Sequence, residues 1–341
     1  MRLADRVAQC RTPFTVENPH NGSLQYLNNA AAFSQCVQNC ATRYLLSDEL
    51  TALCTALAYS KGANTLACLD LLHIPAEHVW VEWAEAPRRN ELARYGFKGL
   101  GGEVASGRRG AYIQSTTQGR RGLVRTFWAQ GQAEADVLCS SMEAYFDFDT
   151  ELGEAPEPLD RRDRPAICVS DASAAKAGIL QRCFRFRYER SWQEYYDAAQ
   201  LTAAQAAAVS RHALGTIAID IPVMMAFMLL LVTRPGLPRR PLELERLNRS
   251  RLKSGKSRLL NQIEVLAPML PDYQPTTGGM SNERRRASRL HHVRGHLVRR
   301  GGKIFWRVPH IRGSARSGVI RQRTVAWIID AAEMKRHTQG T

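Results

Sequence analysis

The chain has 341 residues, of which 44% are hydrophobic and 23% charged, and its formal net charge is +15. This composition is that of a folded globular protein, and it excludes the fibrous, low-complexity and wholly disordered classes. The length allows two domains, each large enough to bury a core. We therefore expect a two-domain α+β protein with an anionic partner.

The positive charge is confined to the last third of the chain. Residues 234–341 contain 24 Lys+Arg and 7 Asp+Glu, a balance of +17, whereas residues 1–233 contain 23 and 25, a balance of −2. We therefore predict a near-neutral mixed α/β domain at 1–233 and a basic C-terminal module at 234–341. A one-sided field of this kind is typical of surfaces that contact the phosphates of nucleic acid.

The periodicity of apolar residues predicts the elements of the first domain. Ser47 and Thr202 are expected to cap the helices that follow them. In chain order we predict helices at 27–43 and 47–60, a strand at 78–85, a hairpin of strands 110–115 and 122–128, a strand at 137–148, an exposed linker at 149–164, a short strand at 166–169, and helices at 191–200 and 203–216.

Residues 217–232 read IAIDIPVMMAFMLLLV and are either a core helix or a membrane segment. A transmembrane helix needs about 20 apolar residues, and a charge such as Asp220 near its centre costs about 3 kcal/mol. Pro222 is tolerated in the first turn of a helix, and the apolar run that follows it is short. We predict a buried core helix that closes the first domain, and no membrane partner. The N-terminal sequence has no apolar core of signal-peptide length, so we expect a cytoplasmic protein.

The eight cysteines all precede residue 184 and include no Cys-x-x-Cys pair. Without an export signal, they are expected to be reduced thiols that serve as small buried hydrophobic residues. Cys36 and Cys40, four residues apart in a predicted helix, could bind zinc together with His20, His73 or His78. Zinc ligands usually come in tighter pairs, so we favour the buried thiols.

Other signatures of enzymes are weak. Asp147, Asp149 and Glu151 alternate at the end of a predicted strand and could hold Mg²⁺, but acidic strand ends are common. Residues 254–257 (SGKS) have only the tail of a phosphate-binding loop and lack its upstream glycine. We predict no metal and no cofactor, and we favour a binding protein over an enzyme.

The basic module begins with a basic helix or arm and ends in a small antiparallel sheet. Paired glycines at 301–302 allow the positive φ that a tight hairpin turn requires. In chain order we predict the arm at 243–258, a strand at 261–270, a flexible bridge at 271–282, strands at 289–298 and 303–308 joined by a turn at 299–302, a loop at 313–318 and a third strand at 319–329.

Seven residues of this sheet are candidates for contact with nucleic acid. Arginine forks bind phosphate or guanine edges, and aromatic rings offer stacking platforms for bases, so that a sheet suits RNA or single-stranded DNA. Two alternatives stay open, a solvated basic face and a face that binds an acidic protein. The candidates are Arg294, Arg299, Arg300, Lys303, Trp306, Arg307 and Arg312.

Three histidines permit a catalytic interpretation. His292, His296 and His310 surround one predicted hairpin, and strict alternation over 289–298 puts the first two on one face with Arg294. Metal-free cleavage of RNA needs one imidazole as base, another as acid and a cation near the phosphorane. Histidines of such sheets more often contact phosphate. A zinc site at the same three residues would lack a completing cysteine or carboxylate.

The C-terminal sequence resembles a block found in uncharacterised proteins of bacteriophages and prophages. That block reads His-x-Val-Arg-Gly-His and then Trp-Arg-x-x-His-x-Arg-Gly, and here it covers His291–His296 and Trp306–Gly313. The resemblance extends over about the last 90 residues and implies a mobile-element origin and an intracellular setting, but no mechanism. We therefore expect a nucleic-acid-binding protein, with a metal-independent nuclease and an effector of an acidic host protein as alternatives.

Overall fold

The structure is a computed structural model whose described residues fall into two compact units. Unit 1 comprises Met1–Val232 and Gly236–Ala267, and unit 2 comprises Thr233–Pro235 and Pro268–Thr341. The predicted strand at 166–169, and most of the predicted linker and of the helix at 191–200, lie outside the described residues. The structure describes residues 2–10, 14–17, 24–27, 30–59, 68–94, 107–116, 118–129, 137–149, 183–189, 192–193, 201–232, 237–268, 289–293, 296–300, 303–307, 310–312 and 314–319.

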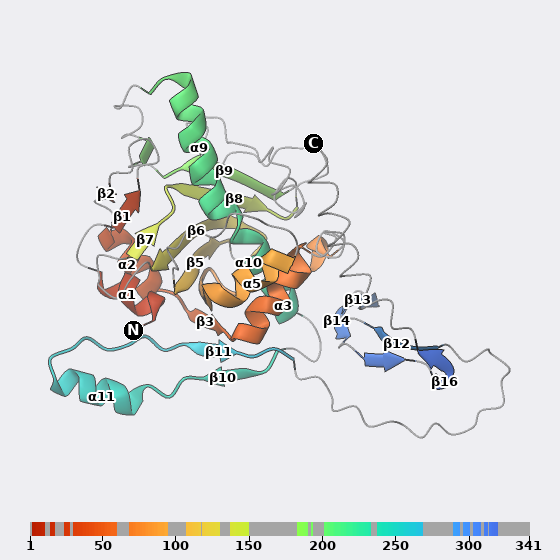
Figure 1. The fold of residues 1–341 in the computed structure, drawn as a ribbon. Coiled ribbons are helices and arrows are strands. Elements are labelled where there is room, and N and C mark those ends of the chain that lie inside the picture. Colours follow the sequence, from red (N-terminus) through yellow and green to blue (C-terminus); the bar gives the residue numbers. More distant parts are fainter. Residues whose placement is uncertain are drawn as a thin grey trace. The chain divides into compact units, whose positions relative to one another are not determined.

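Unit 1 is built on a mixed sheet of 11 strands (Figure 1). β11, β3 and β4 are parallel, as are β1 and β7, and the other pairs are antiparallel. Together with the helices, this sheet confirms the predicted α+β class. Its order is β10 (Arg239–Pro241), β11 (Ile263–Val265), β3 (Thr42–Leu46), β4 (His78–Ala84), β5 (Arg108–Ser115), β6 (Arg121–Ala129), β7 (Val137–Cys139), β1 (Phe14–Glu17) and β2 (Leu24–Leu27), while β8 (Met142–Asp147) joins β6 to β9 (Phe184–Tyr188).

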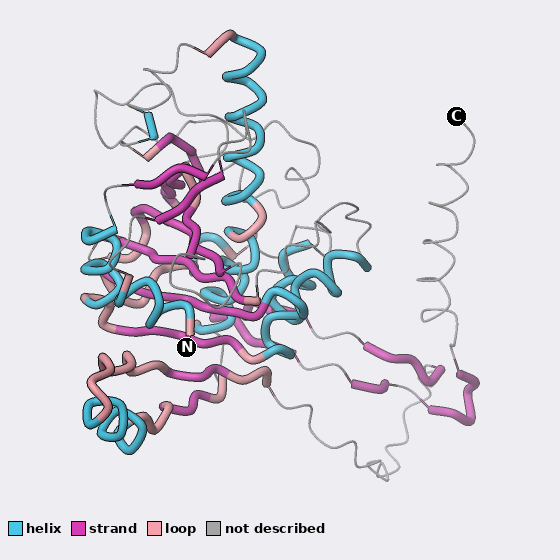
Figure 2. The backbone as a smooth tube through the Cα atoms, turned by 60° about the vertical axis from the view of Figure 1, so that its left-hand side comes forward, coloured by secondary structure: helices cyan, strands magenta, loops and turns pink. Residues whose placement is uncertain are grey.

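Helices cover both faces of the central strands, as the cyan coils on either side of the strands in Figure 2 show. Trp80 of β4 packs in one cluster with helices α1 and α2. Tyr44 of β3 points to the other face, where its ring meets Phe227 of α10 at 5.4 Å. Because both faces are covered, Val79 to Trp83 are all buried. The helices are α1 (Leu3–Gln9), α2 (Ala30–Gln38), α3 (Asp48–Tyr59), the 3-10 turn η1 (Leu69–Leu71), α5 (Glu85–Arg94), α9 (Ala203–Ala218), α10 (Ile221–Leu231) and α11 (Glu245–Lys253).

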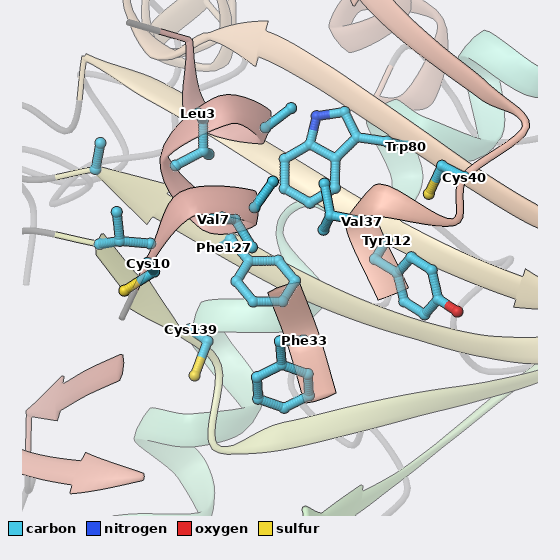
Figure 3. Close-up of a cluster of buried hydrophobic side chains, with 14 of the residues drawn as sticks. Leu3, Val7, Cys10, Phe33, Val37, Cys40, Trp80, Tyr112, Phe127 and Cys139 are labelled. Carbon is cyan, nitrogen blue, oxygen red and sulfur yellow. The ribbon is translucent and has the colours of Figure 1, made fainter. Parts of the chain in front are cut away.

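An aromatic cluster fills the space between the sheet and α1 and α2 (Figure 3). Phe127 of β6 meets the ring of Phe33 edge-on at 5.6 Å and that of Trp80 at the same distance. A Cβ at Gly110 would come within 2.4 Å of the Trp80 ring, so the close approach of β5 to this ring requires glycine. The cluster therefore fixes the register of β4, β5 and β6.

The apolar run forms the core helix α10, as predicted. Asp220 is its N-cap residue, Pro222 lies in its first turn, and its residues from Ile221 to Leu230 are buried in unit 1. By length and composition, Ala203–Leu231 is the one helical stretch among the described residues that could cross a membrane. Its most apolar 18-residue window has a mean hydropathy of 2.2, and 72% of that window is buried inside the protein. Burial of this kind is that of a core helix.

Elements that depend on local signals lie where the sequence predicts them. Ser47 caps α3, since its Oγ accepts a hydrogen bond from the Leu50 amide at 3.2 Å. Thr202 and Gln205 form a reciprocal capping box at the start of α9. The hairpin of β5 and β6 is present, and its turn contains Gly119 at φ 69°.

Three predicted elements have different bounds. The first predicted helix ends at Gln38, and Thr42–Leu46 form the buried strand β3, of which only the first two residues fall within the predicted helix at 27–43. The strand predicted at 137–148 is two strands, β7 and β8, separated by Ser140 and Ser141. The strand at 261–270 contracts to β11.

The boundary between the units falls later than residue 233. Residues 237–267 leave the sheet as β10, form α11 and return as β11, and we call this segment the basic arm. β11 pairs in parallel with β3, with Glu264 opposite Leu45, so the arm belongs to unit 1 (Figure 1). The abrupt change in charge at residue 234 therefore does not coincide with a change of unit.

Unit 2 contains two small sheets. β13 (His296–Arg300) and β14 (Lys303–Arg307) form an antiparallel hairpin, and β12 (Arg289–Val293) lies between β15 (His310–Arg312) and β16 (Ser314–Val319). The prediction of one strand over 289–298 is wrong, because β12 and β13 belong to different sheets. The predicted loop at 313–318 is mostly strand β16, and the predicted third strand at 319–329 lies almost wholly outside the described residues.

Candidate nucleic-acid interface

The β13–β14 hairpin brings most of the candidate contact residues into one ladder of five pairs. Arg300 is the partner of Lys303 next to the two-residue connection, and His296 is the partner of Arg307 at the other end. Arg299 and Trp306 occupy intermediate positions, opposite Ile304 and Leu297. The predicted turn at 299–302 is correspondingly tighter than expected, since Arg299 and Arg300 belong to the strand.

The second sheet of unit 2 contains the remaining candidates that the structure describes. In the β12–β15 ladder His292 is opposite Ile311, and His310 is opposite Val293 in the adjacent pair. Arg312 is opposite His291 in the same ladder. Arg294 lies outside the described residues.

The three histidines of the catalytic hypothesis are therefore not in one sheet. His292 and His310 occupy neighbouring pairs of the β12–β15 ladder, whereas His296 is in the β13–β14 hairpin. The expectation that His292 and His296 share a face required one continuous strand, and that expectation is wrong. Glycine weakens the interior of a strand, and Gly295 immediately precedes β13.

The basic arm carries a second set of exposed cations. Residues 239–258 contain eight Lys+Arg and two Glu, a balance of +6, whereas residues 1–233 are at −2. Arg246, Arg249 and Lys253 of α11 are exposed, as are Lys256 and Arg258 on the returning segment. The sequence predicted a basic helix or arm here. The candidate contact residues were assigned to the hairpin instead, because the hairpin also contains histidines and aromatic residues.

The SGKS segment of the arm is a helix end. Gly255 has φ 69°, its amide donates to the Leu252 carbonyl at 3.1 Å, and the Lys256 amide donates to the Arg251 carbonyl at 2.9 Å. These two bonds define a Schellman motif, which closes the C-terminus of α11. A phosphate-binding loop precedes a helix N-terminus, so this segment is not one.

A buried ion network lies between α5, β5 and the junction of α9 with α10. Arg88 donates to the Glu85 carboxylate, and its Nη1 lies 3.5 Å from Asp220. Arg109 contacts Asp220 at 2.9 Å and the Thr216 carbonyl at 3.0 Å. Burial raises the pKa of Asp220, although Arg109 and Arg88 oppose the rise. Because cations and carboxylates face each other inside the core, we assign the network a structural role.

Residues weighed as metal ligands have other partners. Asp147 forms an ion pair with Arg121 at 3.0 Å and Asp149 pairs with Arg120, while Glu151 is outside the described residues. His78 Nδ1 lies 2.7 Å from the Tyr112 hydroxyl. In the part of the chain that is described, no three His, Cys, Asp or Glu side chains are grouped so as to hold a metal ion.

The described cysteines are thiols, and most are buried. Cys36 is half-buried, and the other six lie in the interior. Burial raises the pKa of Cys40 to about 12, with opposition from Arg43, so its thiol is protonated at neutral pH. A protonated thiol is a poor metal ligand and nucleophile, as expected of cysteine used for packing.

No family model matches this chain, and neither a curated protein nor a solved structure matches it.

Proposed function

We propose that this protein binds nucleic acid, with the β13–β14 hairpin as a contact surface for the phosphate backbone. The observation that carries the proposal is the register of the hairpin. Arg299, Arg300, Lys303 and Arg307 fall within five consecutive pairs, together with Trp306. Because cross-strand partners share a face and successive residues alternate, Arg300, Lys303 and Arg307 fall on one face of the hairpin, and Arg299 and Trp306 on the other. Three cations on one face suit the phosphate backbone, and an arginine beside an aromatic residue on the other suits an unpaired base.

The charge balance of the chain supports the same proposal. The +17 of residues 234–341 greatly exceeds what the −2 of residues 1–233 could neutralise. An excess of this size favours association with a polyanion at a rate that depends on salt. An origin in a bacteriophage or prophage, and a cytoplasmic location, belong to the proposal as predictions from the sequence.

Fluorescence anisotropy of the full chain with labelled single-stranded RNA, single-stranded DNA and duplex DNA tests this proposal. The informative variant is Arg300→Gln/Lys303→Gln, which removes one cross-strand pair of cations. Each lost phosphate contact should lower the slope of log affinity against log salt by about 0.7 for a single strand and 0.9 for a duplex. Two contacts should thus lower it by about 1.4 or 1.8.

The matched control is Arg94→Gln/Arg121→Gln, which removes two charges from exposed sites in unit 1, outside the hairpin. These side chains are 67% and 59% exposed, and each has one carboxylate partner. Wild-type binding whose salt slope falls in the hairpin variant and stays unchanged in the control supports the proposal. Absence of binding by the wild type at 50 mM salt overturns it.

The same samples, run on a gel after binding, test the nuclease alternative. Shortened substrate that disappears in His296→Ala or His310→Ala, while affinity is retained, would assign cleavage to those histidines. Intact substrate leaves the protein as a binder.

A further inference from the structure

Helix α11 carries a line of exposed cations along one face. Arg246, Arg249 and Lys253 follow the spacing i, i+3, i+7, which places them on the same side of an α-helix. Successive members are separated by about 4.5 and 6 Å along the axis. The buried residue of the helix, Asn248, has 5% exposure and marks its inner side. The line of cations is therefore on the solvent side.

These cations lack partners among the described residues, in contrast to their neighbours in the arm. Arg240 pairs with Glu264 across the β10–β11 ladder, and Arg251 donates to the Ser257 carbonyl at 2.9 Å. Glu245 is four residues before Arg249, a spacing that permits an ion pair, yet the described part of the arm contains none between them. The charge on this face is thus available to a ligand.

The arm is held in its shape by specific hydrogen bonds near its tip. The Asn248 side chain donates to the Leu259 carbonyl at 3.1 Å and accepts from the Leu259 amide at 2.7 Å. These bonds tie α11 to the returning segment, and the Schellman motif at Gly255 fixes the turn between them. A surface that is held in this way loses little conformational entropy when it binds.

Helix α1 holds the same returning segment of the arm from the other side of Leu259. Asp5 accepts a hydrogen bond from the Leu260 amide at 2.7 Å, and Gln9 donates to the Arg258 carbonyl at 3.0 Å. Burial raises the pKa of Asp5, and the bond from Leu260 opposes the rise. The arm therefore extends from the sheet edge as part of the folded unit (Figure 1).

The apolar residues of α11 argue against docking as a helix in an apolar groove. Leu247 and Leu252 are 49% and 51% exposed. They are five residues apart, whereas residues that form one apolar stripe are three or four apart. The helix thus presents a continuous line of charge and no continuous apolar stripe, a pattern that suits a polyanion.

We propose that the Arg246–Arg249–Lys253 face of α11, flanked by Lys256 and Arg258, is a second nucleic-acid contact surface that binds the phosphate backbone. This inference rests on the proposed function, because it needs the protein to bind nucleic acid. It goes beyond that function in placing a contact in unit 1, on a rigid arm that is independent of the hairpin in unit 2. Binding through two units explains why the positive charge begins before the end of unit 1.

The test compares the full-length variant Arg246→Gln/Arg249→Gln with the hairpin variant and with the control Arg94→Gln/Arg121→Gln, on single-stranded RNA and duplex DNA. The arm variant should lower the salt slope by about 1.4 on the single strand and about 1.8 on the duplex. When the salt rises from 50 to 200 mM, the affinity of the wild type should therefore fall further than that of the arm variant. The extra fall should be a factor of about 7 on the single strand and about 12 on the duplex. Amide exchange should slow in residues 245–258 when nucleic acid is bound.

The outcomes separate the two proposals. Binding that is weakened by the hairpin variant, but unchanged in slope and in arm exchange by Arg246→Gln/Arg249→Gln, overturns the arm proposal and leaves the function intact. No binding by the wild type overturns both. A slope that falls equally in the control means that overall charge is responsible, and this also overturns the arm proposal. Circular dichroism of each variant establishes that it is folded.

Discussion

Replacing Arg88 by methionine tests how much the buried ion network stabilises unit 1. The guanidinium is 1% exposed, and its Nε donates to Glu85 at 2.7 Å. It also donates to the Ile219 carbonyl at 3.3 Å and lies 3.5 Å from Asp220. Methionine keeps a long apolar side chain in place and removes the charge, so the carboxylates remain buried with fewer partners.

The size of the effect follows from the contacts that remain. Removing one partner of a buried ion pair costs about 3–5 kcal/mol. Asp220 keeps Arg109, at 2.9 Å, and Glu85 keeps Arg89, at 3.1 Å. We therefore expect the lower end, about 3 kcal/mol, a large share of the roughly 5–15 kcal/mol of a typical protein.

Urea unfolding at pH 7, followed by tryptophan fluorescence, measures this loss. The second variant, Arg88→Met/Glu85→Leu, should recover at least about 1 kcal/mol, because an apolar pair replaces an under-compensated buried charge. The control Arg94→Met removes a 67% exposed arginine from its i,i+3 pair with Glu91 and should change the free energy of unfolding by no more than about 1 kcal/mol.

The pH dependence gives an independent check. Burial raises the pKa of Glu85, but Arg88 and the neighbouring arginines outweigh it, so the pKa lies below its ordinary value of 4.5. A carboxylate of this kind stabilises the fold above pH 4.5, and its contribution is lost as the pH falls through the folded-state pKa. The difference in the free energy of unfolding between the wild type and Arg88→Met should thus become smaller as the pH falls below 4.5. A loss under about 1 kcal/mol at pH 7, or a constant difference down to acid pH, would refute the reasoning.

Two further predictions concern buried polar contacts. Asn248→Ala removes both hydrogen bonds to Leu259 and should destabilise the arm by about 2 kcal/mol. The rate of amide exchange in the arm should rise about 30-fold, and the rate in β5 should not change. Arm exchange as slow in the variant as in the wild type would show that the arm does not depend on Asn248. Glu82→Gln puts an amide where a carboxylate accepts from the amides of Leu3 and Ala4, both at 3.0 Å, and from Arg108. We expect a loss of about 2–4 kcal/mol in urea unfolding, and a loss below about 1 kcal/mol would contradict this role for Glu82.

Local signals were sufficient for several elements of this protein. The ten-residue apolar run after Pro222 predicts α10, Thr202 predicts the start of α9, and the glycine-containing turn predicts the β5–β6 hairpin. Each of these depends on residues within a few positions of one another, so that propensity and hydrogen bonding to neighbouring amides decide the outcome.

The candidate site was predicted in part. Paired glycines and flanking β-type residues predict the hairpin. The pairing of Arg300 with Lys303 is a finding of the structure, since the predicted turn began at Arg299. Alternation alone could not show that β12 and β13 belong to different sheets. The partners of β12 are β15 and β16, which come later in the chain.

The sequence by itself determined the distribution of charge, the α+β class and the core helix, because each depends on composition or on the pattern of residues that are close together in the chain. Only the tertiary structure decided that β3 is a strand, that the basic arm belongs to unit 1 and that Asp220 can be buried. β11 pairs with β3 although the two strands are more than 200 residues apart in the sequence, and Arg88 and Arg109 reach Asp220 from α5 and β5. Such pairings depend on how the chain is brought together in space, and a burial cost that is prohibitive for a lone carboxylate becomes acceptable once distant cations surround it.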